Sequence, residues 1–323
     1  MQKASQATLS ERAHDVSEPV MEALAGRLST LIARGGPTPP EYADLEAMVV
    51  RAWEFVGERP GALEHLTSLR GRFPVEFLRE TVHGHGLEKP MGYAGDFLMI
   101  DKIYLSAVSP HEPYRRWDQY FHQHAAPRAV RGRKVYFQKL IESLEAPTGR
   151  PLEVLNLGTG PGRDLSEYLK AHPQADVRIT SVDIDPRASA YARQVLGADE
   201  HRVRLVTENA LRFTTDQKFD LVWSAGLFDY LTDRLFVGMI RRAQRMLRSG
   251  GQIVVGNFSP SNPSRPYMEL LGDWHLRHRS VTDLQALAQR SGFAPEETHV
   301  GAESLGVNLF LHLTHVTDME HAS

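Results

Sequence analysis

A strand-like run that leads directly into a glycine-rich turn is the feature that most constrains the fold. Residues 153–164 read Glu-Val-Leu-Asn-Leu-Gly-Thr-Gly-Pro-Gly-Arg-Asp. Because glycine tolerates backbone angles that other residues avoid, a ligand could approach bare amide groups at Gly158, Gly160 and Gly162, beside a helix N-terminus. A dinucleotide fingerprint needs a further glycine where this chain has Arg163. The turn therefore indicates a ligand site, but argues against a pyrophosphate site of that type.

Short β-branched runs alternate with amphipathic helical segments from residue 149 onward. The expected elements are strands at 152–157, 177–182, 203–206, 221–223 and 253–255, and helices after 162, from 186 and over 232–247. This alternation is typical of parallel βαβ units in a doubly wound α/β sheet. The last two runs, 294–300 and 307–314, are too close for a helical crossover, so they predict an antiparallel β-hairpin at the sheet edge.

The first part of the chain has the periodicity of helices. Apolar residues recur at helical spacing in four segments: 19–33, 40–57, 63–82 with a break near Pro74, and 113–144 around Pro127. The glycine-rich segment 83–96 between them is expected to be non-helical. The resulting domain prediction is a flexible N-terminus (1–16), an α-helical cap or substrate domain (17–147), an α/β domain (148–316) and a C-terminal tail (317–323).

Composition excludes several classes of protein. The 323 residues carry a net charge of −3, which excludes a polycation that coats nucleic acid. There is no cysteine, so disulfides, thiol nucleophiles and Cys-ligated metal centres are excluded. No run approaches the ~18 apolar residues of a membrane span, and the first residues lack the apolar core of a signal peptide. We therefore expect a cytoplasmic protein without a membrane partner.

Polar residues follow the predicted strands. Asp183 ends the second strand and could accept hydrogen bonds from two ribose hydroxyls, with a plain helix cap as the alternative. Asp185 precedes Pro186 and is expected to cap the next helix. Asn209 follows the third strand, and Ser224 ends a Phe-Asp-Leu-Val-Trp-Ser run at the fourth.

Taken in order, these motifs resemble the core of the class I S-adenosylmethionine (SAM)-dependent methyltransferases over residues 150–315. The resemblance implies a Rossmann-like sheet, SAM as cofactor, and a cofactor site made of Gly158, Thr159, Gly160, Gly162, Asp183, Ile184, Asn209, Ala210, Ser224 and Ala225. The resemblance implies that the glycines face the methionine part of SAM, that Asp183 holds the ribose, and that Asn209 and Ala210 meet the adenine. Asn156 and Asn209 stand where the family often has Asp, so there is less negative charge near the cationic cofactor.

A narrower resemblance extends over nearly the whole chain. It rests on Lys-Pro-Met-Gly-Tyr-Ala-Gly-Asp at 89–96, Ser-Ala-Gly-Leu-Phe-Asp-Tyr-Leu at 224–231, and Asn-Phe-Ser-Pro-Ser-Asn-Pro at 257–263 with Trp274 downstream. These segments are similar to the bacterial group that makes a 3-hydroxy fatty acid methyl ester quorum signal. The resemblance implies O-methylation of a carboxylate in a specialised metabolite.

Several residues are candidates for contacts beyond the shared core. Arg133, with Arg131 second, is the predicted anchor for a carboxylate of SAM or of the acceptor, the alternative being a solvated helix face. Tyr93 and Asp96 lie in a glycine-flanked loop that could act as a lid over the cofactor, or be a plain turn. The predicted catalytic residues are Tyr93, Asp229, Tyr230 and His275, with His278 as a second choice for a general base.

A metal site is not predicted. The pairs His83/His85 and His122/His124 lack a placed carboxylate and the i, i+4 spacing of a zinc helix. The predicted function is an enzyme that methylates a small-molecule acceptor, most plausibly at a carboxylate oxygen. Two alternatives stay open: an N-methyltransferase of an amine or heteroaromatic nitrogen, and a SAM-binding regulatory module without turnover. No nucleic-acid partner is expected, and a homodimer stays open.

Overall fold

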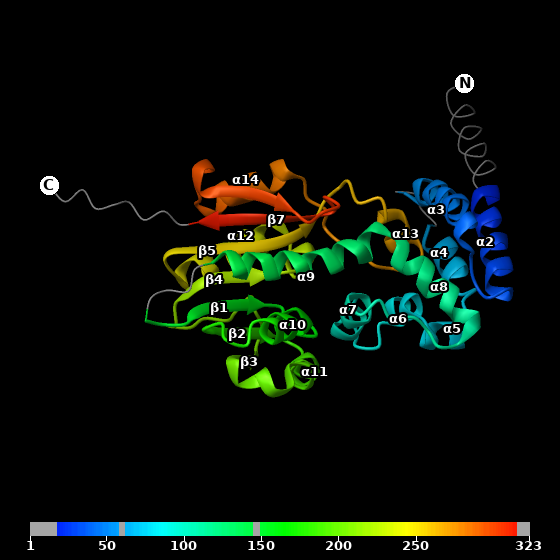
Figure 1. Ribbon diagram of the computed structural model, residues 1–323. Coiled ribbons are helices and arrows are strands. Elements are labelled where there is room, and N and C mark those ends of the chain that lie inside the picture. Colours follow the sequence, from blue (N-terminus) through cyan, green and yellow to red (C-terminus); the bar gives the residue numbers. More distant parts are fainter. Residues whose placement is uncertain (1–17, 58–61, 145–148, 315–323) are drawn as a thin grey trace, which may run out of the picture. The chain divides into compact units, whose positions relative to one another are not determined.

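The computed structural model describes residues 18–57, 62–144 and 149–314, and these fall into two compact units (Figure 1). The helical unit comprises the chain up to Pro127 together with Pro263–His275, and the sheet unit comprises Arg128–Asn262 together with the chain from Leu276. This division lies within a helix, α9, rather than at the expected position near residue 147. The predicted terminal segments 1–16 and 317–323 lie outside the described residues.

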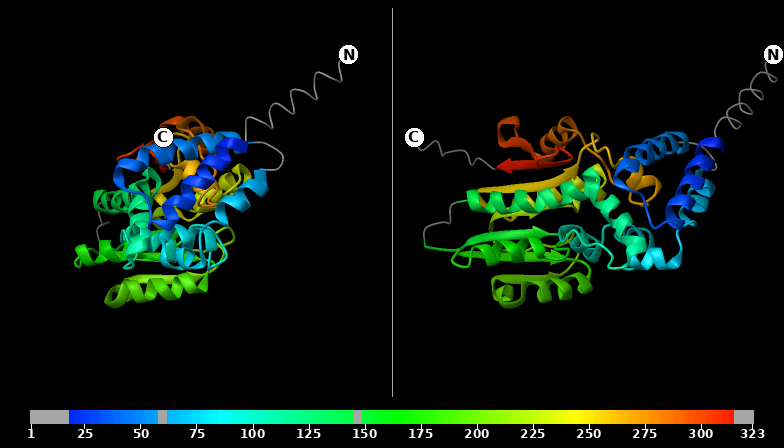
Figure 2. Two further views of the ribbon diagram at one scale, coloured as in Figure 1. Left: turned by 90° about the vertical axis from the view of Figure 1, so that its right-hand side faces the viewer. Right: turned by 45° about the vertical axis from the view of Figure 1, so that its right-hand side comes forward.

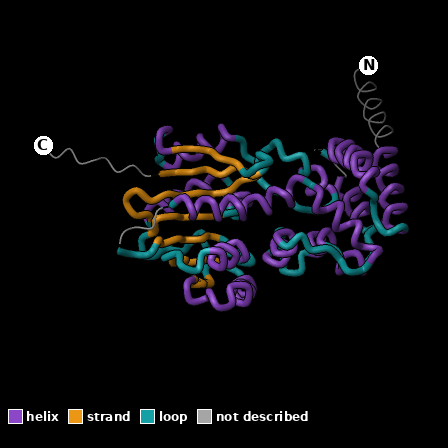
Figure 3. The backbone as a smooth tube through the Cα atoms, in the orientation of Figure 1, coloured by secondary structure: helices purple, strands orange, loops and turns teal. Residues whose placement is uncertain are grey.

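The described part of the helical unit is built from helices alone (Figure 3). They are α2 (Glu18–Ala33), η1 (Pro39–Glu41), α3 (Tyr42–Val56), α4 (Ala62–Arg70), α5 (Val75–Glu80), α6 (Val82–Glu88), α7 (Phe97–Tyr104), α8 (Glu112–Gln123), the start of α9 (Ala125–Ser143), and α13 (Arg265–Leu270). Aromatic rings fill its interior, with Phe77, Trp117 and Tyr120 almost fully buried. The predicted helical character of this part of the chain is confirmed.

The prediction that residues 83–96 are non-helical is wrong for its first half, because α6 covers Val82–Glu88. A Cβ at Gly84 would lie 2.3 Å from the Leu78 Cα and 2.5 Å from the Phe77 carbonyl oxygen. Glycine at 84 therefore allows α6 to pack directly on the backbone of α5, and here it marks close packing rather than a loop. The remaining residues up to Asp96 form a loop that ends at the N-cap of α7.

A seven-stranded sheet forms the centre of the sheet unit. Its strands are β1 (Leu152–Leu157), β2 (Val177–Asp183), β3 (Val203–Thr207), β4 (Phe219–Ser224), β5 (Leu247–Phe258), β6 (Thr298–Ala302) and β7 (Asn308–Thr314). The strand order is β3-β2-β1-β4-β5-β7-β6, with β1 to β5 parallel and β7 antiparallel to both of its neighbours (Figure 2). The predicted doubly wound sheet with an antiparallel hairpin at its edge is confirmed.

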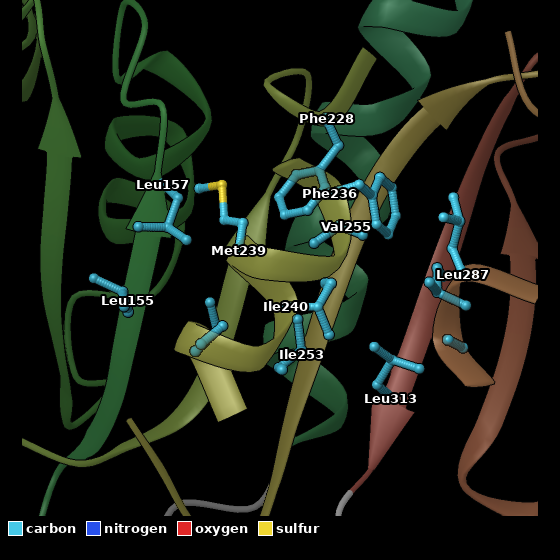
Figure 4. Packing of buried hydrophobic residues seen from close by; sticks show 14 of the residues in the cluster. Leu155, Leu157, Phe228, Phe236, Met239, Ile240, Ile253, Val255, Leu287 and Leu313 are labelled. Carbon is cyan, nitrogen blue, oxygen red and sulfur yellow. The ribbon is translucent and has the colours of Figure 1, made fainter. Parts of the chain in front are cut away.

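Successive strand residues point to opposite sides of the sheet, so both faces carry apolar side chains. Helices cover both faces. The helices that follow the strands are α10 (Arg163–Ala171), α11 (Pro186–Leu196), η2 (Gly197–Arg202), η3 (Phe228–Tyr230), α12 (Asp233–Arg245), α14 (Val281–Ser291) and η4 (Pro295–Glu297). One apolar cluster joins Leu155 and Val255 to Ile240 of α12 and Leu287 of α14 (Figure 4). A second cluster on the other face joins Val154 and Trp223 to residues of α9 and α10.

The order of the parallel strands reverses between β1 and β4. Connections from β1 lead toward β2 and β3 on one side, and the chain then returns to β4 and β5 on the other. In open α/β sheets, ligands bind at the carboxyl ends of the strands at such a switch point. Within residues 18–57, 62–144 and 149–314, no helix combines the length and apolar character needed to cross a bilayer.

Candidate functional site

The glycine turn follows β1 at the switch point. Gly158, Gly160 and Gly162 all have positive φ, at 82°, 56° and 65°, so each uses a conformation that favours glycine. The Gly158 amide donates to the Val182 carbonyl at 2.8 Å, which fixes the turn to the end of β2. Gly162 is also the N-cap of α10. The amides of Gly158, Gly160 and Gly162 bond other groups of the protein, so the turn offers a ligand close approach to bare backbone rather than free donors.

Asp183 joins the end of β2 to this turn. Its Oδ2 accepts from the Gly160 amide at 3.0 Å and its Oδ1 from the Asp185 amide at 2.9 Å. Burial raises the pKa of Asp183, although these backbone donors oppose the shift. Each carboxylate oxygen keeps a second lone pair, so two hydroxyl groups of a ligand could still donate to it. The predicted helix cap of α11 is Asp185, which accepts from the Arg187 amide, so Asp183 is not that cap.

An apolar side chain and an amide lie next to Asp183 at the strand ends. Ile184 is 65% exposed, and such exposure of a large apolar residue at a strand end suits the face of an aromatic ring. Asn209 uses its Oδ1 to accept from the Leu211 amide at 2.9 Å and closes the turn after β3. Its amide group and the backbone of Ala210 remain available at this edge. These residues could border an adenine, as predicted.

Three polar side chains predicted near the cofactor hold the strand ends together instead. Ser224 is fully buried and donates to the Leu157 carbonyl at 2.7 Å, which joins β4 to β1. Asn156 donates to the Ser181 hydroxyl at 2.9 Å, and the Thr159 hydroxyl bonds the same Ser181 oxygen. Any contact that Thr159, Ser224 or Ala225 makes with a ligand would therefore use the backbone. The Asn156 amide donates this hydrogen bond to Ser181, and an ionised Asp at the same position could not donate it.

Arg133 on α9 reaches the loop after β4. It is buried, with 7% of its surface exposed, whereas Arg131 is only partly buried. A Cβ at Gly226 would lie 2.5 Å from the Arg133 Nη1. A side chain at 226 would therefore force the end of the Arg133 side chain to move. Arg133 was predicted from the sequence as a site residue, but Gly226 was not. This glycine stands two residues after Ser224, within the segment 224–231 described above.

Two buried carboxyl groups interact electrostatically with Arg133. Burial raises the pKa of Asp164 to about 6, and the charge of Arg133 opposes this. Burial likewise raises the pKa of Asp229 to about 7, opposed by a hydrogen bond from the Phe258 amide at 2.7 Å and by the charge of Arg133. Near neutral pH these two carboxyl groups therefore place negative charge beside the guanidinium, whose planar set of donors suits a carboxylate. Asp164 was missed as a candidate; its place in the first turn of α10 was the available signal.

A buried arginine positions the η3 turn that carries Asp229 and Tyr230. Arg279 donates to the Phe228 and Leu231 carbonyls at 3.1 and 2.6 Å and to the Asn257 Oδ1 at 2.7 Å. The turn is therefore tied to the end of β5. Tyr230 itself is 43% exposed and could meet an acceptor, as predicted. No sequence motif pointed to Arg279.

The other predicted residues belong to the helical unit. Tyr93 is 39% exposed in the loop before α7. Asp96 is buried and accepts from the Leu98 and Met99 amides and from the His85 Nε2 at 2.9 Å. His275 is exposed, with its Nε2 3.4 Å from Asp273. Their roles toward a cofactor or an acceptor stay predictions, since these contacts are internal to the helical unit.

Metal-binding chemistry has little support here. Over the part of the chain that the structure describes, no three His, Asp or Glu side chains gather as they would around a metal ion. His83 bonds Tyr267 and the Leu271 carbonyl, and His85 bonds Asp96. His122 bonds the Ala107 carbonyl. Each of these imidazoles has a partner inside the protein.

Comparisons with known proteins agree with this arrangement. Residues 154–251 match the family model of a methyltransferase domain. The crystal structure of a possible exported protein from Bordetella parapertussis superposes with a TM-score of 0.60 at 19% sequence identity, over 87% of this chain and 99% of that chain. This similarity supports the fold of both parts of the chain. No curated protein sequence matches.

Two enzyme structures are similar over a smaller part of the chain. One is the 1,6-didemethyltoxoflavin-N1-methyltransferase of Burkholderia thailandensis with S-adenosylhomocysteine bound, at 21% identity, 58% of this chain, 79% of that chain and a TM-score of 0.43. The other is the magnesium protoporphyrin IX methyltransferase of Synechocystis, at 15% identity, 59% of this chain, 87% of that chain and a TM-score of 0.46. Over residues 154–251 the sheet unit is therefore similar to a methyltransferase domain, and the glycine turn and Asp183 are compatible with SAM as the cofactor.

Proposed function

We propose that the protein transfers the methyl group of SAM to a carboxylate oxygen of a small hydrophobic metabolite. The observation that supports this most is the buried guanidinium of Arg133, for which Gly226 leaves room. Its neighbours Asp164 and Asp229 have pKa values raised by burial to about 6 and 7, and the charge of Arg133 opposes both shifts. A buried cation of this kind favours an anionic ligand group.

In this proposal SAM binds along the carboxyl ends of the strands of the sheet unit. Asp183 would hold the ribose hydroxyls, and Ile184 and Asn209 would border the adenine. The bare backbone of the glycine turn and Asp164 would meet the methionine end, where Asp164 could accept from the α-ammonium group. Bound SAM would supply a methyl group on a positively charged sulfur. The chain's contribution would be to align the acceptor with that methyl and to exclude water.

A carboxylate acceptor needs alignment more than it needs a base. With a pKa of ~4–5, a carboxyl group is already ionised at neutral pH, so it can attack the methyl directly. A guanidinium can bind a carboxylate through two parallel hydrogen bonds and so fix its direction. The same contact could instead hold the carboxylate of the methionine end of SAM. Separate binding measurements for the two ligands distinguish these roles of Arg133.

A second candidate function is favoured by Asp229. A buried carboxyl with a pKa of about 7 can take a proton near neutral pH. An amine, a phenol or a heteroaromatic N–H would need such a base before methyl transfer. Asp229 lies in the η3 turn after β4, with Tyr230 beside it. The N-methyltransferase alternative therefore stays part of the proposal.

The decisive experiment incubates the purified protein with isotopically labelled SAM and a cell extract, followed by mass spectrometry. A labelled methyl ester supports the carboxylate acceptor, and a labelled methylamine supports the alternative. The pH profile of the rate separates them further: a flat profile above pH 6 fits a carboxylate, and a steep alkaline rise fits an amine or a phenol. Tight SAM binding without any labelled product would favour a regulatory module and contradict enzymatic turnover.

Arg133 offers a matched pair of variants for this assay. We expect Arg133→Met to raise the KM for the carboxylate acceptor about 10-fold or more, whereas Arg133→Lys should retain part of the affinity through its charge. Unfolding curves show whether stability changes as well. An unchanged KM for both acceptor and SAM would remove Arg133 from the site.

The rest of the functional prediction joins this proposal. We propose a bacterial enzyme of specialised metabolism, similar to the quorum-signal methyl ester group, that works in the cytoplasm. In this proposal the helical unit is the cap that selects the acceptor, and Tyr93, Asp96 and His275 contribute from it. Methyl transfer to 3-hydroxy fatty acids of different chain length tests the first part. A substitution at Tyr93 tests the second part, because it should change which acceptor the enzyme prefers.

A further inference from the structure

Two buried polar atoms of the helical unit have no protein partner among the described residues. They are the Tyr120 Oη and the His124 Nε2. The two rings are neighbours, with centroids 4.6 Å apart and planes at 73°. Buried polar atoms in native proteins almost always have a hydrogen-bond partner, because leaving one without a partner costs its full desolvation penalty. Two such atoms on adjacent rings point to a partner that the chain does not supply.

The hydrogen-bonding role of His124 follows from its other ring nitrogen. Its Nδ1 lies 2.9 Å from the Tyr120 carbonyl oxygen and 3.3 Å from that of Phe121. Carbonyl oxygens only accept, so Nδ1 carries the proton and donates it. Burial lowers the pKa of His124 to about 4, so the ring is neutral near pH 7. The Nε2 atom is therefore an acceptor that needs a donor.

Glu46 of α3 borders the same place. Its Oε1 is 3.6 Å from the His124 Nε2, and half of its side chain is exposed, whereas His124 is buried. Burial raises the pKa of Glu46, but the ionised carboxylate and a neutral imidazole nitrogen are both acceptors, so ionised Glu46 cannot satisfy the His124 Nε2.

We propose that Tyr120 and His124 bind a neutral hydroxyl group, from water or a small alcohol, with Glu46 beside it. A hydroxyl both donates and accepts, so it can donate to the His124 Nε2 and accept from the Tyr120 O–H. An ammonium group has no lone pair for the Tyr120 hydrogen, and a carboxylate has no hydrogen for the Nε2. The rings of Tyr42 and Tyr267 pack directly on these two side chains, with centroids 4.9 Å from Tyr120 and 4.0 Å from His124.

Matched removal of two hydroxyls tests whether the site is occupied. Tyr267→Phe is the control, because the Tyr267 hydroxyl has a partner inside the chain, the His83 Nδ1, at 2.6 Å. If a bound hydroxyl serves Tyr120, then Tyr120→Phe should lower the melting temperature by about 2–4 °C, as the control should. A bare, unpartnered hydroxyl would give the opposite result, since its removal relieves a desolvation penalty. A melting temperature that rises in Tyr120→Phe would therefore overturn the proposal.

A crystal structure of the unmodified protein provides a second measurement that does not depend on a variant folding. An oxygen within about 3.2 Å of both the Tyr120 Oη and the His124 Nε2 supports the proposal, and its absence contradicts it. Crystals grown with and without propan-1-ol distinguish the source: continuous density into a carbon chain identifies the alcohol, and an isolated oxygen identifies water. The proposal is independent of methyl transfer, so its failure would leave the assignment of the sheet unit unchanged.

Discussion

The candidate site of the sheet unit and the aromatic cluster of the helical unit bury different kinds of polar side chain. In the sheet unit, the buried groups around the candidate site are ionisable and interact as charges: Arg133 with Asp164 and Asp229. In the helical unit, the buried cluster consists of His83, His124 and tyrosines that are neutral at pH 7. The difference indicates that the candidate site of the sheet unit suits charged ligand groups, whereas the aromatic cluster of the helical unit suits neutral ones.

The largest expected effect tests the charged side of this comparison. Asp183→Ala removes the carboxylate that two ribose hydroxyls would bond, and each such charge-assisted bond contributes about 1.5–3 kcal/mol. We expect the affinity for SAM to fall about 100-fold or more, as measured by titration calorimetry. The variant also loses the bonds from the Gly160 and Asp185 amides, which helps to explain a large effect.

A control lies two residues further along the chain. Asp185→Ala removes the N-cap of α11, which should lower stability by about 1 kcal/mol and leave SAM affinity nearly unchanged. In the helical unit, Asp96→Asn tests whether a carboxylate there also contacts the cofactor. Undiminished SAM affinity in Asp183→Ala would contradict the ribose assignment. A large loss in Asp96→Asn would mean that the charged site is not confined to the sheet unit.

Gly226→Ala tests the position of the Arg133 guanidinium. The new methyl group would lie 2.5 Å from the Arg133 Nη1 and so must displace it. We expect kcat/KM for a carboxylate acceptor to fall about 10- to 100-fold, because the anchoring contact would be misplaced. Steady-state kinetics with the acceptor identified by mass spectrometry gives this value.

Gly238→Ala is the matched control for that substitution. Gly238 lies in α12, and a Cβ there would have no heavy atom within 4 Å. Alanine is the better helix former, so this variant should be slightly more stable, by up to about 1 kcal/mol, with unchanged kinetics. Equal activity of the two alanine variants would show that the Arg133 position does not matter for turnover.

Much of the fold could be predicted from the sequence because the signals are local. The β-branched runs, the glycine turn and the short 301–306 connection each predict a specific element, and the strand order then follows from the rules for parallel connections. Segment 83–96 shows where local reasoning fails. Gly84 resembles a helix breaker, but its role is to let α6 approach Leu78, and no neighbouring residue in the sequence reports that contact.

The candidate site was predictable in the same partial way. Asp183 and the glycines stand at strand ends, where position alone indicates a ligand contact. Ser224 and Thr159 stand at strand ends as well, yet their hydroxyls bond other parts of the sheet unit. Asp164 and Gly226 gain their importance from Arg133, which is distant in the sequence. Side-chain direction and long-range pairing therefore account for what the sequence could not predict.

The smallest expected effect is an opposite pH response of the two units. In the sheet unit, the folded protein holds protons on Asp164 and Asp229 more tightly than the unfolded chain does, so their contribution to stability is largest at low pH and is lost as pH rises through about 6 to 7. In the helical unit, burial lowers the pKa of His83 and His124 to about 4, so their contribution is present above about pH 6.5 and is lost as pH falls toward 4.

Other groups oppose this trend: in the helical unit burial raises the pKa of Asp118 to about 6 and also raises that of Glu46, and in the sheet unit it lowers the pKa of His312 to about 4. In the helical unit the two histidines have the larger shifts between pH 5 and pH 7, and in the sheet unit Asp183 shifts in the same direction as Asp164 and Asp229. Acidification from pH 7 to pH 5 should therefore weaken the helical unit and strengthen the sheet unit, by about 1.4 kcal/mol per pH unit for each proton that is not offset. Hydrogen exchange followed by mass spectrometry, corrected for intrinsic rates, reports on both at once. Parallel changes in protection of α8 and β4 would show that the units do not differ in this way. Asp229→Asn should reduce the gain of the sheet unit and leave α8 unaffected, because it removes one proton-binding group from the sheet unit alone.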